Sequence, residues 1–213
     1  MKKKLLGYYD YTVVLTYCGM LFAFLGILRV LAQNYCEGVC CLMLAGICDM
    51  FDGMVASTKE RTADEKRFGI QIDSLSDLIS FGVLPAVFVF MISDKNPVVG
   101  FFAALFALCA LIRLAYFNVL EEARQNQTAE RRKSYLGVPV TTIAVLLPAV
   151  WLLYDYRVFK NTLCFPVLLL LMGAGFLAPV EIKKPGIVGK LGILFIGMLE
   201  AVGMFLFLGW GAV

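Results

Sequence analysis

Residues 48–82, CDMFDGMVASTKERTADEKRFGIQIDSLSDLISFG, carry four aspartates at helical spacing on the two sides of one short basic loop. Asp49 and Asp52 are three residues apart, so in a helix their side chains project within about 60° of each other. Asp73 and Asp77 are four residues apart and also share one helical face. Three small residues lie on these faces: Gly53, Ala56 and Gly69. Two antiparallel helices of this kind would bring the four carboxylates into one crevice near one membrane surface.

The composition identifies the class of protein. Hydrophobic residues make up 61% of the 213 residues, against roughly 45 to 50% in soluble domains. The apolar runs are continuous, which argues against the alternating strands of a membrane β-barrel. We therefore expect an all-α, polytopic bundle of about seven transmembrane helices. The whole chain, residues 1–213, is expected to form a single domain with a short N-terminal segment at the membrane interface.

Seven apolar runs approach the roughly 20 residues that a helix needs to cross a bilayer. They cover residues 11–31, 36–56, 69–93, 97–119, 137–154, 162–180 and 190–210. The basic segment before the first run is expected to lie at the cytoplasmic interface. It does not resemble a cleaved signal peptide, because the apolar run that follows is too long and ends without a small-residue cleavage site.

The distribution of basic residues predicts the orientation. With the N-terminus in the cytoplasm, fourteen basic residues fall in cytoplasmic segments and three in outer segments, which is a strong positive-inside bias. The cytoplasmic set is Lys2, Lys3, Lys4, Lys59, Arg61, Lys66, Arg67, Arg124, Arg131, Arg132, Lys133, Lys183, Lys184 and Lys190, and the outer set is Lys95, Arg157 and Lys160. The acidic crevice is therefore expected at the cytoplasmic face of a cell membrane, here a prokaryotic plasma membrane.

The aspartates are expected to be partly immersed in the membrane. After Asp77 only about 15 nonionic residues precede Ser93 and Asp94, whereas a span needs about 20. An ionised carboxylate inside a span costs several kcal/mol, and four neighbouring negative charges also repel one another. Two divalent cations would cancel the four charges, and hard oxygen ligands favour Mg²⁺ or Mn²⁺. The small residues beside the acids would leave room for a phosphate group on the metal ions.

Two other interpretations of the acids remain open. Acidic pairs at helix ends are often solvated surface groups or partners of nearby lysines. Acids inside spans also occur in cation-coupled and proton-coupled transporters. Against a transporter, the acids gather near one face, the remaining spans offer only Glu200 as an acidic partner, and no matched pair of interrupted helices occurs in two halves.

The acidic pattern resembles the signature of the CDP-alcohol phosphotransferases, membrane enzymes that displace CMP from a CDP-linked lipid or alcohol. The matching residues are Asp49-x-x-Asp52-Gly53-x-x-Ala56 and Gly69-x-x-x-Asp73-x-x-x-Asp77. The resemblance implies that Asp49, Asp52 and Asp73 bind two divalent metal ions. It also implies that Asp77 is the general base and an additional metal ligand.

The chain departs from the family pattern in two places. Ser57 stands where the family usually has arginine, and eleven residues separate Ser57 from Gly69 where eight are usual. Lys59 or Arg61 is expected to replace the missing guanidinium. The residues expected to contact CDP-diacylglycerol are Gly53, Ala56, Ser57, Lys59, Arg61 and Gly69.

Further stretches resemble the phosphatidylserine synthases within this family. They are Asp10-Tyr-Thr12-Val-Val-Leu-Thr16, Phe68-Gly-Ile-Gln-Ile-Asp73-Ser-Leu, Arg113-Leu-Ala-Tyr116-Phe117-Asn118, Tyr135-Leu-Gly137-Val-Pro139 and Lys183-Lys184-Pro185. The reaction implied is CDP-diacylglycerol plus L-serine giving phosphatidylserine and CMP. The partners implied are these substrates, membrane lipids and a second copy of the chain in a homodimer, with no nucleic acid.

Arg113 and Asn118 are candidate ligands of the acceptor or of a phosphate. A guanidinium makes bidentate contacts with carboxylates and phosphates alike. The alternative is that Arg113 extends to the interface or pairs with Glu121 or Glu122. The acceptor alcohol also remains open, because enzymes that use glycerol 3-phosphate or inositol phosphate carry the same acidic signature.

Overall fold

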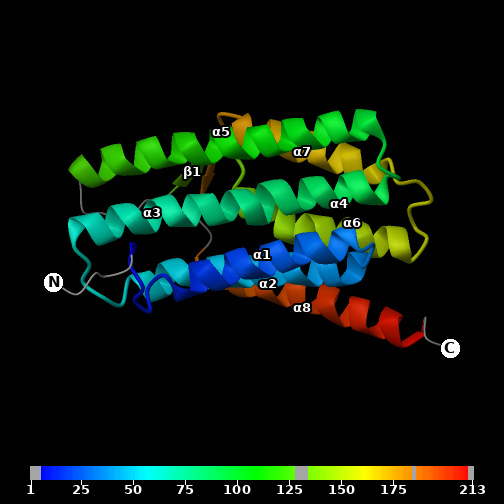
Figure 1. Cartoon of the computed structure of the whole chain (residues 1–213), viewed down its shortest axis with the longest axis horizontal. Coiled ribbons are helices and arrows are strands. Elements are labelled where there is room, and N and C mark those ends of the chain that lie inside the picture. The colour runs from blue at the N-terminus through cyan, green and yellow to red at the C-terminus, as the bar shows by residue number, and fades with distance from the viewer. Residues whose placement is uncertain (1–5, 128–133, 184–185, 211–213) are drawn as a thin grey trace.

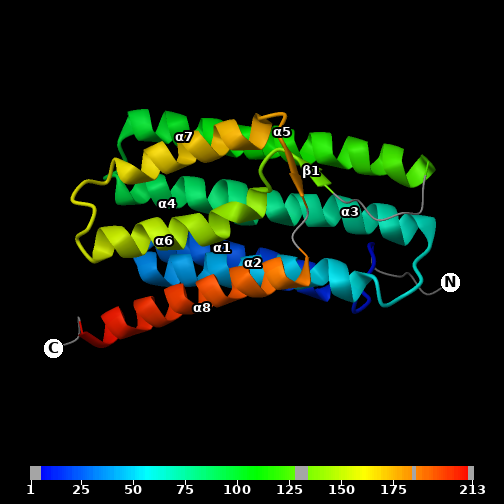
Figure 2. The same ribbon diagram turned by 180° about the vertical axis from the view of Figure 1, so that it is seen from behind.

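The apolar runs form helices that lie side by side along one long axis (Figures 1 and 2). The structure is a computed structural model that describes residues 6–127, 134–183 and 186–210. The helices in chain order are α1 (Val14–Leu31), α2 (Tyr35–Ala56), α3 (Ala63–Asp77), the π-helix η1 (Leu78–Val83), α4 (Leu84–Ile92), α5 (Pro97–Gln127), the 3-10 turn η2 (Val140–Thr142), α6 (Ile143–Asp155), α7 (Cys164–Leu177) and α8 (Ile187–Trp210). Two short strands are β1 (Ser134–Leu136) and β2 (Glu181–Lys183).

Five of these helical segments are long and apolar enough to cross a membrane. They are Val14–Leu31, Tyr35–Ala56, Ala63–Ile92, Pro97–Arg124 and Val188–Leu206. Two shorter apolar helices, Val140–Asp155 and Cys164–Leu177, accompany them. The prediction of a polytopic helical membrane protein is confirmed.

The fifth and sixth predicted spans are helical over only part of their predicted length. Gly137 has a left-handed backbone, with φ +79°, and Pro139 is extended, so α6 cannot begin before this turn. Ala178 is extended at the end of α7 because it precedes a proline, which disfavours helical geometry. The freed segments pair instead as antiparallel β1 and β2, with Tyr135 opposite Ile182. This strand pair was not predicted, because both segments lie within or beside apolar runs that indicate helices.

Small residues allow α1 and α2 to pack closely. A Cβ on Gly26 would lie 2.9 Å from the Cβ of Cys41, and a Cβ on Gly38 would lie 2.3 Å from a methyl group of Val30. Small residues at such contacts let two helix backbones approach, as membrane helix pairs require. The result is a closely packed pair, in which Asp49 and Asp52 lie near the C-terminal end of α2.

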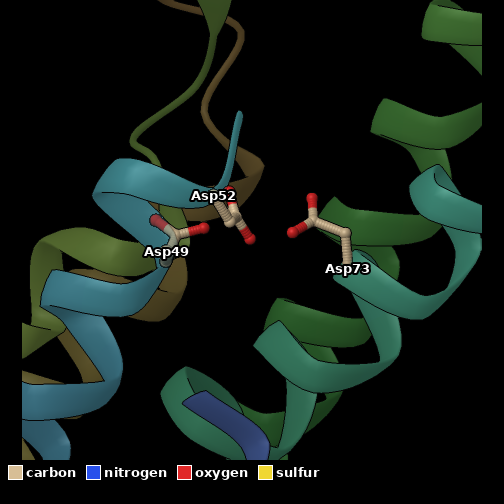
Figure 3. A group of neighbouring side chains, drawn as sticks. All are labelled: Asp49, Asp52 and Asp73. Carbon is tan, nitrogen blue, oxygen red and sulfur yellow. The ribbon is translucent and has the colours of Figure 1, made fainter. Parts of the chain in front are cut away.

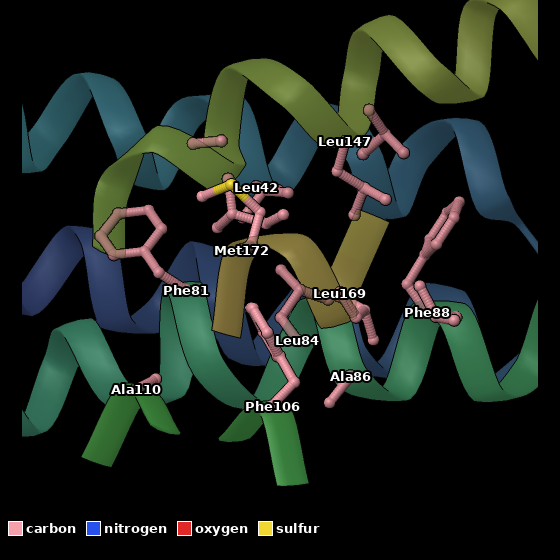
Figure 4. Packing of buried hydrophobic residues seen from close by; sticks show 14 of the residues in the cluster. Leu42, Phe81, Leu84, Ala86, Phe88, Phe106, Ala110, Leu147, Leu169 and Met172 are labelled. Carbon is pink, nitrogen blue, oxygen red and sulfur yellow. The ribbon is translucent and has the colours of Figure 1, made fainter. Parts of the chain in front are cut away.

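A dry core joins α4 to the helices around it (Figure 4). Helices α3, η1 and α4 form one continuous segment, Ala63–Ile92, which is the third rod of the bundle. Its Phe81 and Leu84 are each 1% exposed, as are Leu42 of α2 and Leu147 of α6. Phe106 of α5 and two residues of α7 complete the layer. The core therefore holds the C-terminal half of the rod whose N-terminal half, α3, carries Asp73 and Asp77.

The third rod changes its helical pitch directly after Asp77. Residues Leu78–Val83 form a π-helix between α3 and α4. Pro85 lacks an amide hydrogen, and its ring crowds the carbonyl group four residues earlier, so a wider turn here keeps the rod continuous. π-Turns of this kind occur frequently at functional sites. This one changes the register between the acidic face of α3 and the core face of α4.

Candidate active site

The predicted acids come together at one end of the bundle. Asp49 and Asp52 on α2 face Asp73 on α3 across the space between the two helices (Figure 3). One carboxylate oxygen from each of the three lies within 4.8 Å of the others. Asp52 is 9% exposed, and the other two are partly buried. In the described part of the chain this is the one group of three side chains that fits a metal ion.

Asp77 lies one turn farther along α3 and is not a member of this group of three. Its side chain interacts with Asp49. Together with Asp49, Asp52 and Ser80 it lines a cavity of about 10 Å³, which is close to the space that one water molecule needs. The four predicted acids are thus adjacent, but Asp77 stands deeper than the triad.

Helix α1 contributes a hydrogen bond that orients one aspartate of the triad, Asp52. The hydroxyl of Thr16 donates a hydrogen bond of 3.1 Å to a carboxylate oxygen of Asp52. Ser76 on α3 donates to the main-chain oxygen of Thr16 at 3.2 Å. These buried contacts link α1, α2 and α3 and limit the rotation of the Asp52 carboxylate. Thr16 belongs to the segment Asp10–Thr16 that resembles the phosphatidylserine synthases, but no spacing pattern links it to Asp52, which is 36 residues away.

The loop between α2 and α3 is held by ion pairs. Thr62 caps α3 in a reciprocal arrangement with Glu65. Lys59 lies 2.6 Å from Asp10 and 3.3 Å from Glu65. The hydrogen bond from Lys59 lowers the pKa of Asp10 to about 2. The ion pair is therefore complete above the ordinary pKa of an aspartate and is lost as the pH falls towards 2.

Lys59 pairs with Asp10 and Glu65, whereas Arg61 lies against Gly69 of α3. Its Nη1 atom is 2.9 Å from the position that a Cβ on Gly69 would occupy, one helical turn before Asp73. Gly53 has open space around it, with no atom within 4 Å of such a Cβ. The exposed Ser57 donates its hydroxyl to the carbonyl of Met54 in its own helix. Of the residues predicted to contact CDP-diacylglycerol, Arg61 and Gly69 therefore lie one helical turn from Asp73, and Gly53 follows Asp52 with open space beside it.

Asn118 and Arg113 both lie on α5, and of the two Asn118 contacts the acidic helix α3. Asn118 accepts a hydrogen bond of 2.7 Å from Ser74, the neighbour of Asp73. Arg113 is 6% exposed, donates to the carbonyl of Gly137 at 3.5 Å and lies 5.9 Å from the ring centre of Phe117.

The two glutamates considered for Arg113 have other partners. Glu121 pairs with Arg124, and Glu122 lies 3.9 Å from Arg67. Several predicted interfacial cations lie outside the described residues: Lys2, Lys3, Lys4, Arg131, Arg132, Lys133 and Lys184.

A much larger cavity than the one beside Asp77 lies at the opposite end of the bundle. It measures about 730 Å³ and is lined by residues of the α1–α2 and α4–α5 turns and of the end of α6. Its acidic residues form no group of three that fits a metal ion within the described ranges. Size alone therefore does not locate the chemistry, and the aspartate end remains the candidate site.

A family comparison agrees with this geometry. Residues 11–178 match the family model described as CDP-alcohol phosphatidyltransferase. The chain belongs to the CDP-alcohol phosphatidyltransferase family. The matched region contains the four aspartates, Arg113 and Asn118, whereas β2 and α8 lie beyond it.

Curated relatives within this family are about one third identical to the chain over the aligned stretches. A CDP-diacylglycerol–serine O-phosphatidyltransferase of Saccharomyces cerevisiae is 33% identical over 131 residues, which cover 60% of this chain and 46% of the relative. An archaetidylserine synthase of Methanothermobacter thermautotrophicus is 36% identical over 121 residues, covering 54% and 47%. A CDP-diacylglycerol–serine O-phosphatidyltransferase of Methanocaldococcus jannaschii is 32% identical over 131 residues, covering 62% and 56%. The chain spans about half the length of the curated relatives it matches, and no solved structure matches it.

Proposed function

We propose that the protein transfers the phosphatidyl group of CDP-diacylglycerol to the hydroxyl of L-serine, giving phosphatidylserine and CMP. The observation that carries the proposal is the convergence of Asp49, Asp52 and Asp73, whose oxygens lie within 4.8 Å of one another in the family's acidic pattern. Relatives named for transfer to serine support serine as the acceptor. A single catalytic domain, residues 1–213, is part of the proposal.

The acidic triad fits divalent cations, which the family generally uses. Its donors are carboxylate oxygens, the ligands that Mg²⁺ and Mn²⁺ prefer. We propose two such ions, held by Asp49, Asp52, Asp73 and Asp77. When bound, they would polarise the diphosphate and stabilise the charge that develops on the departing CMP.

The side chains supply the remaining steps. Asp77 accepts the proton of the serine hydroxyl, which is a poor nucleophile at neutral pH. The serine oxygen then bonds to the phosphorus of the phosphatidyl group, and the bond to the CMP oxygen breaks. Arg61 takes the place of the family arginine missing at Ser57 and binds a substrate phosphate. Arg113 and Asn118 hold the acceptor or a phosphate.

The acceptor is tested by supplying each alcohol separately. Purified protein in mixed micelles with CDP-diacylglycerol and Mn²⁺ is expected to release CMP when L-serine is added. Glycerol 3-phosphate and inositol phosphate are expected to give only background release. Serine-independent release with glycerol 3-phosphate would assign the protein to a different branch of the family.

We propose that the active site faces the cytoplasm and that the protein forms a homodimer. Support for the orientation is the basic bias of the end that carries the acids. The loop with Lys59 and Arg61 lies at that end, whereas the turn with Lys95 lies at the other (Figure 1). Light scattering of the detergent-solubilised protein tests the dimer.

Membrane-impermeant thiol reagents test the orientation. Ser57→Cys, at an exposed position after α2, is expected to be labelled only from the cytoplasmic side. Lys95→Cys, exposed in the α4–α5 turn, is the matched control and is expected to be labelled only from outside. Unmodified protein corrects for the native cysteines. The opposite pattern would reverse the orientation and the side from which substrate enters.

A further inference from the structure

A lysine from the last helix reaches the acidic site. Lys190 lies in the first turns of α8, beyond the region that matches the family model. Its Nζ atom donates a hydrogen bond of 3.2 Å to the main-chain oxygen of Met50, which stands between Asp49 and Asp52. The ammonium group therefore lies at the edge of the metal-binding triad, although α8 is otherwise almost entirely apolar.

The position of this ammonium is unlike that of an interfacial lysine. A lysine near the end of a membrane helix usually extends towards the lipid headgroups. Lys190 is instead half-buried, points towards α2 and acts electrostatically on Asp52. An ammonium carries three N–H groups, and in the described part of the chain one of them is used by Met50. The remaining donors are available to an anion in the crevice.

In the proposed reaction, the negative charge of the substrate diphosphate needs a positively charged partner. Two divalent ions balance the four aspartates, so the negative charges of a CDP-linked diphosphate need other partners. Arg61 lies on the α3 side of the acids and Lys190 on the α2 side. Two cations on opposite sides of the triad would bind phosphate oxygens while leaving the metal ligands undisturbed.

We propose that Lys190 binds a phosphate oxygen of the CDP-linked substrate, so that α8 contributes a substrate contact from outside the family region. This inference rests on the proposed function. It assigns to Lys190 a binding role rather than proton transfer.

The test measures binding of CDP and of Mn²⁺ separately by calorimetry on the full-length protein. Lys190→Met keeps the length of the side chain and removes the charge. We expect it to weaken CDP binding by about 10- to 100-fold, the range for losing a hydrogen bond to a charged group. Mn²⁺ affinity, measured without nucleotide, is expected to stay equal or to increase, because a positive charge beside Asp52 has been removed. Lys190→Arg is expected to restore part of the CDP affinity.

The exposed Lys66 on α3 provides the matched control, since Lys66→Met removes the same charge from the same end of the bundle. It is expected to leave CDP binding unchanged. Unaltered CDP affinity in Lys190→Met would overturn the proposal, as would parallel loss of CDP and Mn²⁺ binding, which would mark a structural role. A variant that binds CDP normally but loses its response to added anionic lipid would assign Lys190 to bulk headgroups and also overturn it. Failure of the unaltered protein to bind CDP would instead count against the proposed function.

Discussion

Replacing Asp49, Asp52 or Asp73 by asparagine is expected to abolish CMP release while the protein remains inserted in the membrane. One carboxylate oxygen from each of the three aspartates lies within 4.8 Å of the corresponding oxygens of the other two. The three carboxylates would therefore share the positive charge of a metal ion. A neutral amide of the same size cannot balance that charge. CMP release with CDP-diacylglycerol and serine measures the chemistry, and Mn²⁺ titration of the same preparations measures the metal site.

The matched control is Asp64→Asn, which removes an exposed carboxylate from the first turn of the same helix α3. It is expected to retain nearly full activity and Mn²⁺ binding. A triad variant that keeps more than about a tenth of the wild-type turnover would contradict the metal site, because removing a charge-bearing catalytic group usually costs at least that much. Cation flux into liposomes without CMP release would favour the transporter interpretation.

Asp77→Asn is expected to separate binding from chemistry. Asp77 lies deeper than the triad, and the three clustered carboxylates remain in the variant. Nucleotide and Mn²⁺ binding should therefore persist, whereas transfer to serine should fall by about 10²- to 10⁴-fold, as expected for loss of a general base. The measurement is calorimetric binding of CDP and Mn²⁺ beside serine-dependent CMP release.

Thr16→Val is an informative companion to Asp77→Asn. It removes the hydroxyl that orients Asp52 but keeps the proposed base. We expect it to weaken Mn²⁺ binding, because the orientation of Asp52, a proposed metal ligand, depends on that hydroxyl. Equal loss of binding and turnover in Asp77→Asn would make Asp77 an ordinary metal ligand.

The main features of the fold could be predicted because they are local. A continuous apolar run identifies a span whatever its neighbours are, and the spacing of Asp49 and Asp52 defines a helical face without tertiary information. The meeting of that face with Asp73 followed from one short loop between two long helices. The predicted lengths of α6 and α7 were too long. Hydrophobicity does not indicate that Gly137 adopts a left-handed backbone or that Ala178, before Pro179, is extended.

The parts that could not be predicted depend on contacts between residues distant in the chain. Lys190 and Met50 are 140 residues apart, and nothing in either segment indicates the pairing. Thr16 reaches Asp52 across 36 residues. Lys59 was expected to contact substrate, and its ion pairs with Asp10 and Glu65 arise from how the N-terminal segment folds back on the loop. Such contacts depend on how the helices pack against one another. The spacing of apolar and charged residues along the sequence does not specify that packing.

The strand pair has a consequence for how the chain could be shortened. The amide of Gly137 donates to the carbonyl of Val180 at 2.7 Å, and β2 follows immediately after that residue. A version cut at residue 178, where the family match ends, would keep all four aspartates but lose this acceptor beside Arg113. The residues after the end of the family match therefore make contacts with the matched region. Through these contacts the segment after α7 ties α7 to the turn before α6, so we expect a chain shortened at residue 178 to be less stable.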